Sequence, residues 1–131
     1  MGEDRIKVVA ATQKGAALLV LSGSWRVLII TSWEGEIFSQ LLRGGDSQIH
    51  AVFLPGYSQA VPEAFDLWLE RVHPLLVALP EVQSGLVPHL ASRNIPYLEL
   101  RDVGAISFRQ KGRRLELFSF LKGPLGFYSY I

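Results

Sequence analysis

Apolar residues along the chain form short runs separated by turn-forming residues, and this pattern predicts the secondary structure. Residues 5–11 are β-branched and partly alternating, which is typical of an edge strand. Two further apolar runs, residues 16–21 and 26–31, are joined by a Ser-Gly-Ser segment at residues 22–24. Because glycine adopts a positive φ without a Cβ clash, this connection predicts a β-hairpin.

Two longer segments have the periodicity of amphipathic helices. Residues 34–43 place apolar side chains on one face and are followed by two glycines, which stop a helix. Residues 62–72 carry the clearest pattern, with Pro62 in the first turn and Pro74 as the terminator. The apolar stripe of this second helix consists of Phe65, Trp68, Leu69 and Val72.

The rest of the chain alternates in the same way. Further strands are predicted at residues 49–54, 75–79 and 97–100, a short helix near 87–93, and a closing hairpin at 105–109 and 115–120. Helices that alternate with apolar strands favour parallel pairing, here flanked by antiparallel hairpins. We therefore expect an α/β fold, with a mixed sheet of about seven strands and two or three helices.

Residues 1–131 are expected to form a single domain, whose aromatic tail at residues 123–131 either docks on a partner or stays loose. Hydrophobic residues make up 49% of the chain and charged residues 19%. Either most strands are buried on both faces, or one apolar surface is reserved for a partner. No apolar run is long enough for a transmembrane helix, so no membrane insertion is expected.

Few residues offer catalytic or metal-binding chemistry. The chain has no cysteine, and its three histidines, His50, His73 and His89, are too far apart in sequence to place two ligands on one element. No Gly-x-Ser-x-Gly segment and no phosphate-binding loop is present. We therefore predict no catalytic residue, no metal ligand and no cofactor, and we expect His73 and His89 to make ordinary polar contacts at helix ends.

Basic side chains gather near the closing hairpin, at Arg109, Lys111, Arg113 and Arg114. Residues 101–131 carry six Lys/Arg against two Asp/Glu, whereas the net charge of the whole chain is only +1. In one interpretation Arg109, Lys111 and Arg113 share a face and contact nucleic-acid phosphates. In the other, which we favour, they form a solvated hairpin tip that discourages edge-to-edge aggregation.

The aromatic residues divide into two groups. Trp33, Phe65 and Trp68 are expected in the core. The remaining large aromatics are harder to bury in so small a domain, and side chains of this kind are typical of interfaces. The predicted interface residues are Trp25, Phe118, Phe120, Phe127, Tyr128 and Tyr130.

Three segments carry a family resemblance. Residues 27–33 read Val-Leu-Ile-Ile-Thr-Ser-Trp, residues 54–58 read Leu-Pro-Gly-Tyr-Ser, and residues 101–108 read Arg-Asp-Val-Gly-Ala-Ile-Ser-Phe. From Gly15 to about Leu121 this series resembles the C-terminal half of a metallo-β-lactamase-like domain, most closely that of ComEC-type competence proteins, which import DNA. The resemblance implies half of an αββα fold, which leaves one sheet face uncovered.

The resemblance also marks where the family's metal ligands are missing. Its ligand Asp corresponds to Trp33, its paired histidines correspond to Gly56 and Tyr57, and its N-terminal His-x-His-x-Asp-His segment is absent. The chain therefore resembles a degenerate relative or a fragment, and we expect it not to be an enzyme. As it stands it is expected in the cytoplasm, but outside it if it is a fragment of a membrane competence protein.

These observations leave three hypotheses. The leading one is a binding or structural module that pairs with itself or with another protein subunit through apolar surface. The second is a DNA-binding accessory domain of competence-type uptake, which depends on the basic hairpin. The third, a residual metal-dependent hydrolase, is the least favoured, because the ligands that the family uses are lost.

Overall fold

The structure is a computed structural model that describes residues 5–44, 48–56, 61–81, 85–100, 106–111, 114–119 and 123–129. In the last three segments it describes the backbone, together with the exposure of Arg109 and Glu116.

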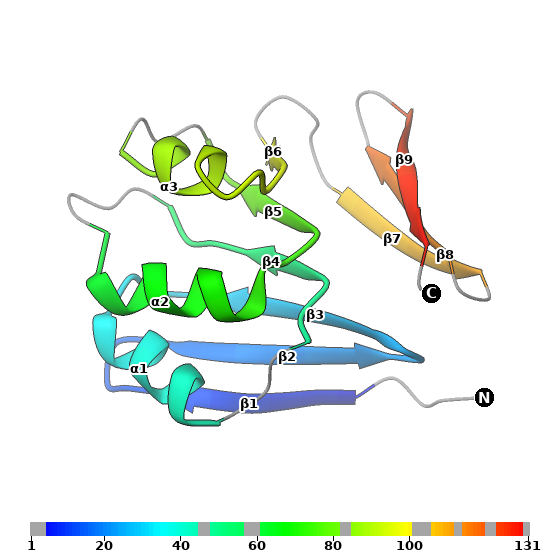
Figure 1. The fold of residues 1–131 in the computed structure, drawn as a ribbon. Helices are drawn as coiled ribbons and strands as arrows, with labels where there is room; N and C mark the ends of the chain where they lie inside the picture. Colours follow the sequence, from blue (N-terminus) through cyan, green and yellow to red (C-terminus); the bar gives the residue numbers. More distant parts are fainter. Residues whose placement is uncertain are drawn as a thin grey trace.

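A six-stranded mixed sheet forms the larger part of the fold (Figure 1). Its strands, in spatial as well as chain order, are β1 (Arg5–Ala11), β2 (Ala16–Ser22), β3 (Trp25–Ile30), β4 (Ala51–Phe53), β5 (Leu76–Leu79) and β6 (Tyr97–Glu99). The first three strands are antiparallel to one another, and β3 to β6 are parallel. The predicted combination of an antiparallel hairpin with parallel strands is confirmed.

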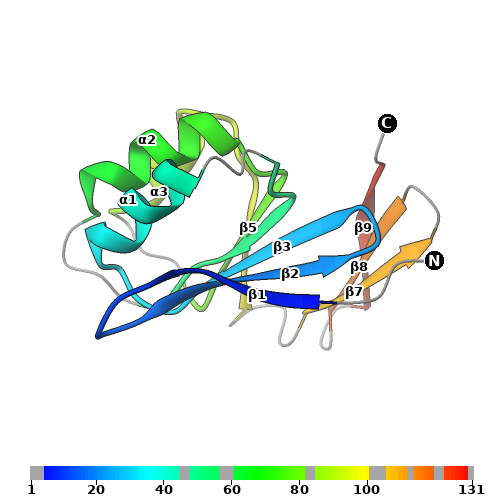
Figure 2. The ribbon, with the colours of Figure 1, turned by 90° about the horizontal axis from the view of Figure 1, so that it is seen from below.

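Three helices connect the parallel strands, because a parallel pair needs a crossover. They are α1 (Gly35–Gly44), α2 (Glu63–Val72) and α3 (Val87–Ala91), and all three lie on the same side of the six-stranded sheet (Figure 2). The other side of this sheet carries no helix in the described part of the chain. No helix among the described residues is long and apolar enough to cross a membrane.

Local chemistry explains the main boundaries. Gly23 has a φ of 58° in the turn between β2 and β3, as the hairpin prediction requires. Pro62 is the N-cap of α2 with an extended backbone, one position before the first turn in which we expected it. His73 ends α2 in a left-handed conformation with a φ of 45°. Its position fits the residue before Pro74, because proline disfavours helical backbone at the preceding residue.

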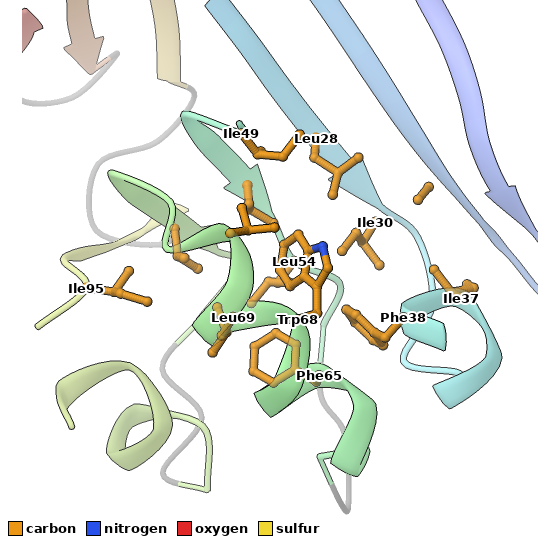
Figure 3. Packing of buried hydrophobic residues seen from close by; sticks show 14 of the residues in the cluster. Leu28, Ile30, Ile37, Phe38, Ile49, Leu54, Phe65, Trp68, Leu69 and Ile95 are labelled. Atoms are coloured by element: carbon orange, nitrogen blue, oxygen red, sulfur yellow. The ribbon is translucent and has the colours of Figure 1, made fainter. Parts of the chain in front are cut away.

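The core lies between the sheet and the helices, and aromatic rings from α1 and α2 form its centre (Figure 3). The ring centroids of Phe38 and Phe65 are 5.2 Å apart, and those of Phe38 and Trp68 are 5.9 Å apart. Phe65 is 0% exposed and Trp68 is 1% exposed. The core assignment of these two residues is confirmed, and Trp33 packs against the cluster while remaining partly exposed.

A second sheet follows in the chain, with β7 (Ile106–Lys111), β8 (Arg114–Ser119) and β9 (Gly123–Ser129) in antiparallel order. The predicted closing hairpin is confirmed as β7 and β8, and residues 123–129 of the tail form a strand paired with β8. The α/β class, the mixed sheet and the three helices are therefore as predicted. The strands, however, divide between two sheets, whereas we expected about seven in one.

Candidate functional site

The side of the six-stranded sheet that faces away from the helices is apolar across all six strands. Cross-strand partners in a sheet point to the same side, so the strand register defines this surface. One row of partners runs Val8, Leu18, Ile29, Phe53, Ala78 and Leu98. The next row runs Ile6, Val20, Val27, Ala51 and Leu76. We call these eleven positions the open face, and none of them carries a charge.

Exposure is uneven along the open face. Ile6 is 71% exposed, Val8 is 64% exposed and Ile29 is 36% exposed, whereas Ala51 and Leu76 are buried. The accessible part is therefore on the antiparallel strands, and we call it the β1–β3 patch. It consists of Ile6, Val8, Leu18, Val20, Val27 and Ile29. Contiguous exposed aliphatic side chains are typical of a surface that packs against another molecule.

The outer edge of β1 is less suited to a partner strand. Gln40 of α1 accepts a hydrogen bond from the backbone N–H of Ala11 at 2.9 Å and donates one to its carbonyl oxygen at 3.0 Å. The β1–β2 register shifts between Val8 and Ala10, and Arg5 and Lys7 are exposed charges on the strand. Bulges and charges of this kind discourage edge-to-edge pairing. The patch, rather than the edge, is therefore the candidate binding surface.

The carboxyl ends of β3 and β4 lead to Trp33 and Gly56, two positions at which the sequence resemblance implied missing metal ligands. The indole nitrogen of Trp33 donates a hydrogen bond to the backbone carbonyl oxygen of Gly56 at 2.6 Å. The ring of Trp33 lies 5.2 Å from that of Phe65 and 6.0 Å from that of Phe38. An indole donates only through its N–H and offers no lone pair to a metal. Tyr57 lies outside the described residues.

Close packing of backbone segments supports this region. The hydroxyl of Thr12 donates a hydrogen bond to the Glu34 carboxylate, and the Thr31 hydroxyl accepts one from the backbone N–H of Ala16 at 2.9 Å. A Cβ on Gly15 would lie 2.4 Å from Cβ of Ser32, so only glycine fits there. These polar groups hold the β1–β2 turn against the end of β3. Their hydrogen bonds give Thr12, Thr31 and Glu34 a structural role.

His50 is buried directly before β4. Its Nδ1 accepts a hydrogen bond from the backbone N–H of Arg26 at 3.0 Å, and its own backbone N–H donates to the carbonyl oxygen of Arg26 at 2.9 Å. Burial, followed by the nearby Arg26 charge, lowers the pKa of His50 below its ordinary value of 6.5. The imidazole is therefore a neutral, structural acceptor.

The structure corrects one predicted interface residue. Trp25 is 1% exposed, and its ring lies 4.6 Å from that of His50. It therefore cannot contact a partner on the surface. Trp25 is followed in β3 by a run that is apolar on both faces, so the sequence alone does not distinguish a buried tryptophan from an exposed one at this strand end.

Of the other predicted interface and basic residues, those that the structure describes lie on strands of the second sheet. Arg109 is exposed, and the register places it opposite Glu116, while Lys111 is opposite Arg114. Arg113, Phe120 and Tyr130 lie outside the described residues. The backbone register pairs Leu115 with Tyr128, Glu116 with Phe127 and Ser107 with Phe118, and it leaves their role at an interface as a prediction.

The sequence analysis missed an ionic cluster between α2 and α3. His89 Nδ1 lies 2.6 Å from Asp66 Oδ1, and Arg93 lies 3.4 Å from both Asp66 and Glu70. These residues line a shallow groove on the helical side. The helical spacing of Asp66 and Glu70 was available from the sequence, but their pairing with α3 depends on tertiary structure. Among the described residues no group of three or more acidic, His or Cys side chains is arranged to hold a metal.

Comparisons with known proteins give limited information. No protein-family model matches the chain, and no curated protein matches it. One similar solved structure is that of a new diphosphatase from the PhnP family, with 12% sequence identity and a TM-score of 0.40. The match covers 87% of this chain and 48% of that one, so this chain spans about half the length of that neighbour. At this level the likeness carries no conclusion about activity.

Proposed function

We propose that this chain is a non-catalytic binding module that pairs with a second copy of itself through the β1–β3 patch. The observation that carries the proposal is the exposure of Ile6 and Val8 within a sheet face that has no charged position. Burial of exposed aliphatic surface stabilises an association by roughly 25 cal/mol per Å² of apolar area. The charge-free patch therefore favours contact with another apolar surface.

A second copy is the occupant that fits the shape of this surface. Two sheets pack face to face when both inner faces are apolar, with helices left on the outer sides. A two-fold axis would bring the same patch of two chains together, and such an interface must be self-complementary. A patch without charges meets this condition, because no like charges are brought together. The result would be an αββα arrangement, the layer order that the family resemblance implies.

The native mass of the purified chain over a concentration series tests this proposal. We expect a dimer for the unaltered chain and a monomer for Val8→Lys, because the lysine places a charge within the apolar surface that the two copies bury. Leu67→Lys is the matched control, since Leu67 is 54% exposed on α2, on the helical side of the sheet. A chain that remains monomeric at all concentrations, or a Val8→Lys variant that still dimerises, would contradict the proposal.

A second candidate function is DNA binding of the kind used in competence-type uptake, and one structural feature favours it. Lys111 and Arg114 are direct cross-strand partners in the β7–β8 hairpin. Basic residues that are adjacent in a hairpin are typical of the phosphate contacts that nucleic-acid-binding proteins make. If this function is correct, binding to duplex DNA should weaken with salt, and Arg114→Glu should reduce it. Absence of binding at low salt would exclude this function.

A further inference from the structure

A cavity of about 230 Å³ lies between the helical side of β1–β3 and the C-terminal end of α1. Its floor is a row of cross-strand partners, Lys7, Leu19 and Leu28. The opposite wall includes Leu41 and Trp68 from the two helices. The cavity therefore lies mainly on the helical side of the sheet, and at the edge strand β1 it is also bordered by Val8 of the β1–β3 patch.

Most side chains that line this cavity are aliphatic or aromatic, and several of them belong to the hydrophobic core. Leu19 is 0% exposed, and Leu28 and Trp68 are 1% exposed, so the inner end reaches into the centre of the fold. Ile49 and Leu28 lie close together above Trp68 in Figure 3, where they form part of the same wall. An engineered apolar cavity of about 150 Å³ stays dry and binds benzene, so a cavity of this kind can accept an apolar guest.

The space continues to the end of α1. A Cβ placed on Gly44 would meet no atom within 4 Å, which shows that neighbouring groups do not fill this side of the cavity. Glycine at the last position of the helix therefore leaves an opening between α1 and β1.

Lys7 gives the opening its chemical character. Lys7 on β1 is the cross-strand partner of Leu19, which is in turn the partner of Leu28. The two leucines are buried, whereas Lys7 is exposed. Among the described residues Lys7 forms no salt bridge within 4.0 Å. A positively charged ammonium group at the entrance of an apolar cavity complements a ligand with one apolar chain and one anionic head group.

We infer that this cavity binds a short or medium-length aliphatic carboxylate, with the chain between Leu28 and Trp68 and the carboxylate at Lys7. This assignment does not depend on the proposed dimer, because Val8 is the one residue of the β1–β3 patch that also borders the cavity. The Ile29→Lys variant, at a patch position that does not line the cavity, should therefore keep the ligand site.

Butanoate, hexanoate and octanoate are the probes for this inference. Titration of each into the full chain, followed by the NMR shifts of the Leu19 and Leu28 methyl groups, gives the affinity and the location of binding. Each added methylene should raise the affinity about fourfold, which corresponds to about 0.8 kcal/mol per buried CH₂. Absence of saturable shifts at these methyl groups, or an affinity that does not change with chain length, would overturn the inference.

The role of the charge is tested separately. Octanoate should bind about threefold more tightly than octanol, the gain expected for an exposed ion pair. Lys7→Gln should remove this difference, and Lys14→Gln, which removes an exposed lysine from the β1–β2 turn, should preserve it. Equal binding of octanoate and octanol to the unaltered chain would overturn the assignment of an anionic head group.

Filling the cavity tests its location. Leu41→Phe and Gly44→Leu each add volume from α1, and each should abolish octanoate binding. Two variants are needed because either substitution alone can disturb the fold, which circular dichroism would reveal. Octanoate binding that persists in a folded variant of either kind would show that the ligand lies elsewhere and would overturn the inference.

Discussion

Trp33 and Gly56 are joined by a hydrogen bond of 2.6 Å from the indole nitrogen to the backbone carbonyl oxygen. The bond connects the segments that follow β3 and β4, which are neighbouring parallel strands. In open α/β sheets the carboxyl ends of such strands are where ligands bind. Here an indole ring occupies this position and packs against Phe65 and Phe38. The same residue therefore occupies this end of the sheet and extends the hydrophobic core.

This relationship predicts that Trp33 is a stability residue. Trp33→Phe keeps the ring contacts and loses the hydrogen bond, so we expect it to lower the free energy of unfolding by about 1 kcal/mol. Trp33→Asp also loses the ring contacts and places a charge beside two aromatic rings, so we expect a loss of about 3 kcal/mol. Urea unfolding of the three chains measures both. Equal stability of the two variants would show that the rings contribute nothing.

His50 should make the stability of the fold depend on pH. Its pKa is lowered in the folded chain from the ordinary value of 6.5, because burial disfavours the charged imidazole. As the pH falls below about 6.5, the unfolded chain takes up the proton before the folded chain does. The contribution of the neutral histidine is therefore present above this pH and is lost progressively between the ordinary pKa and the lower folded-state pKa.

Urea unfolding at a series of pH values between about 5 and 8 measures this dependence of the free energy of unfolding on pH. His50→Gln removes the titrating group and should flatten the curve in this range. His73→Asn is the matched control, because His73 is exposed and asparagine tolerates its left-handed backbone. A curve that is unchanged in His50→Gln would show that another group causes the pH dependence.

Gln40 should prevent the edge strand β1 from pairing with a strand of another chain. Its side-chain amide makes two hydrogen bonds with the backbone of Ala11, in place of a neighbouring strand. Gln40→Ala leaves these backbone groups open to another chain, so we expect faster aggregation and a loss of stability of about 1 kcal/mol. Light scattering on heating measures the first effect. Gln13→Ala, at an exposed position in the β1–β2 turn, should aggregate like the unaltered chain.

Local sequence signals were sufficient to predict much of the fold. The stripe that includes Phe65 and Trp68 predicted α2, because helical periodicity and burial coincide there. The Gly23 turn likewise predicted the β2–β3 hairpin, because few residues adopt its positive φ. In contrast, the division of the strands into two sheets depends on which edges pair, and no local pattern specifies that.

The candidate site was predictable only in outline. The apolar excess indicated an uncovered sheet face, but Trp25, which the register places on the same side of the sheet as Val27, is not accessible there. Trp25 is buried beside His50, whereas Ile6 and Val8 are the most exposed large apolar residues in the described part of the chain. Alternation in β1 places these two side chains on the same face, but only the register shows that β2 and β3 continue the surface.

The Asp66–His89 pair should hold α3 against α2. The two side chains are 2.6 Å apart, and Arg93 lies 3.4 Å from the same carboxylate oxygen. Asp66→Asn removes the charge that both partners contact, and because the groups are partly exposed we expect a loss of only about 1 kcal/mol. The loss of stability should be larger for α3 than for the whole fold, since α3 has five residues and depends on its tertiary contacts.

Hydrogen exchange of the α3 amides should therefore accelerate in the Asp66→Asn variant. Glu63→Gln, in the same groove but without an ion pair among the described residues, should leave the exchange unchanged, and equal acceleration in both variants would contradict a specific role for Asp66.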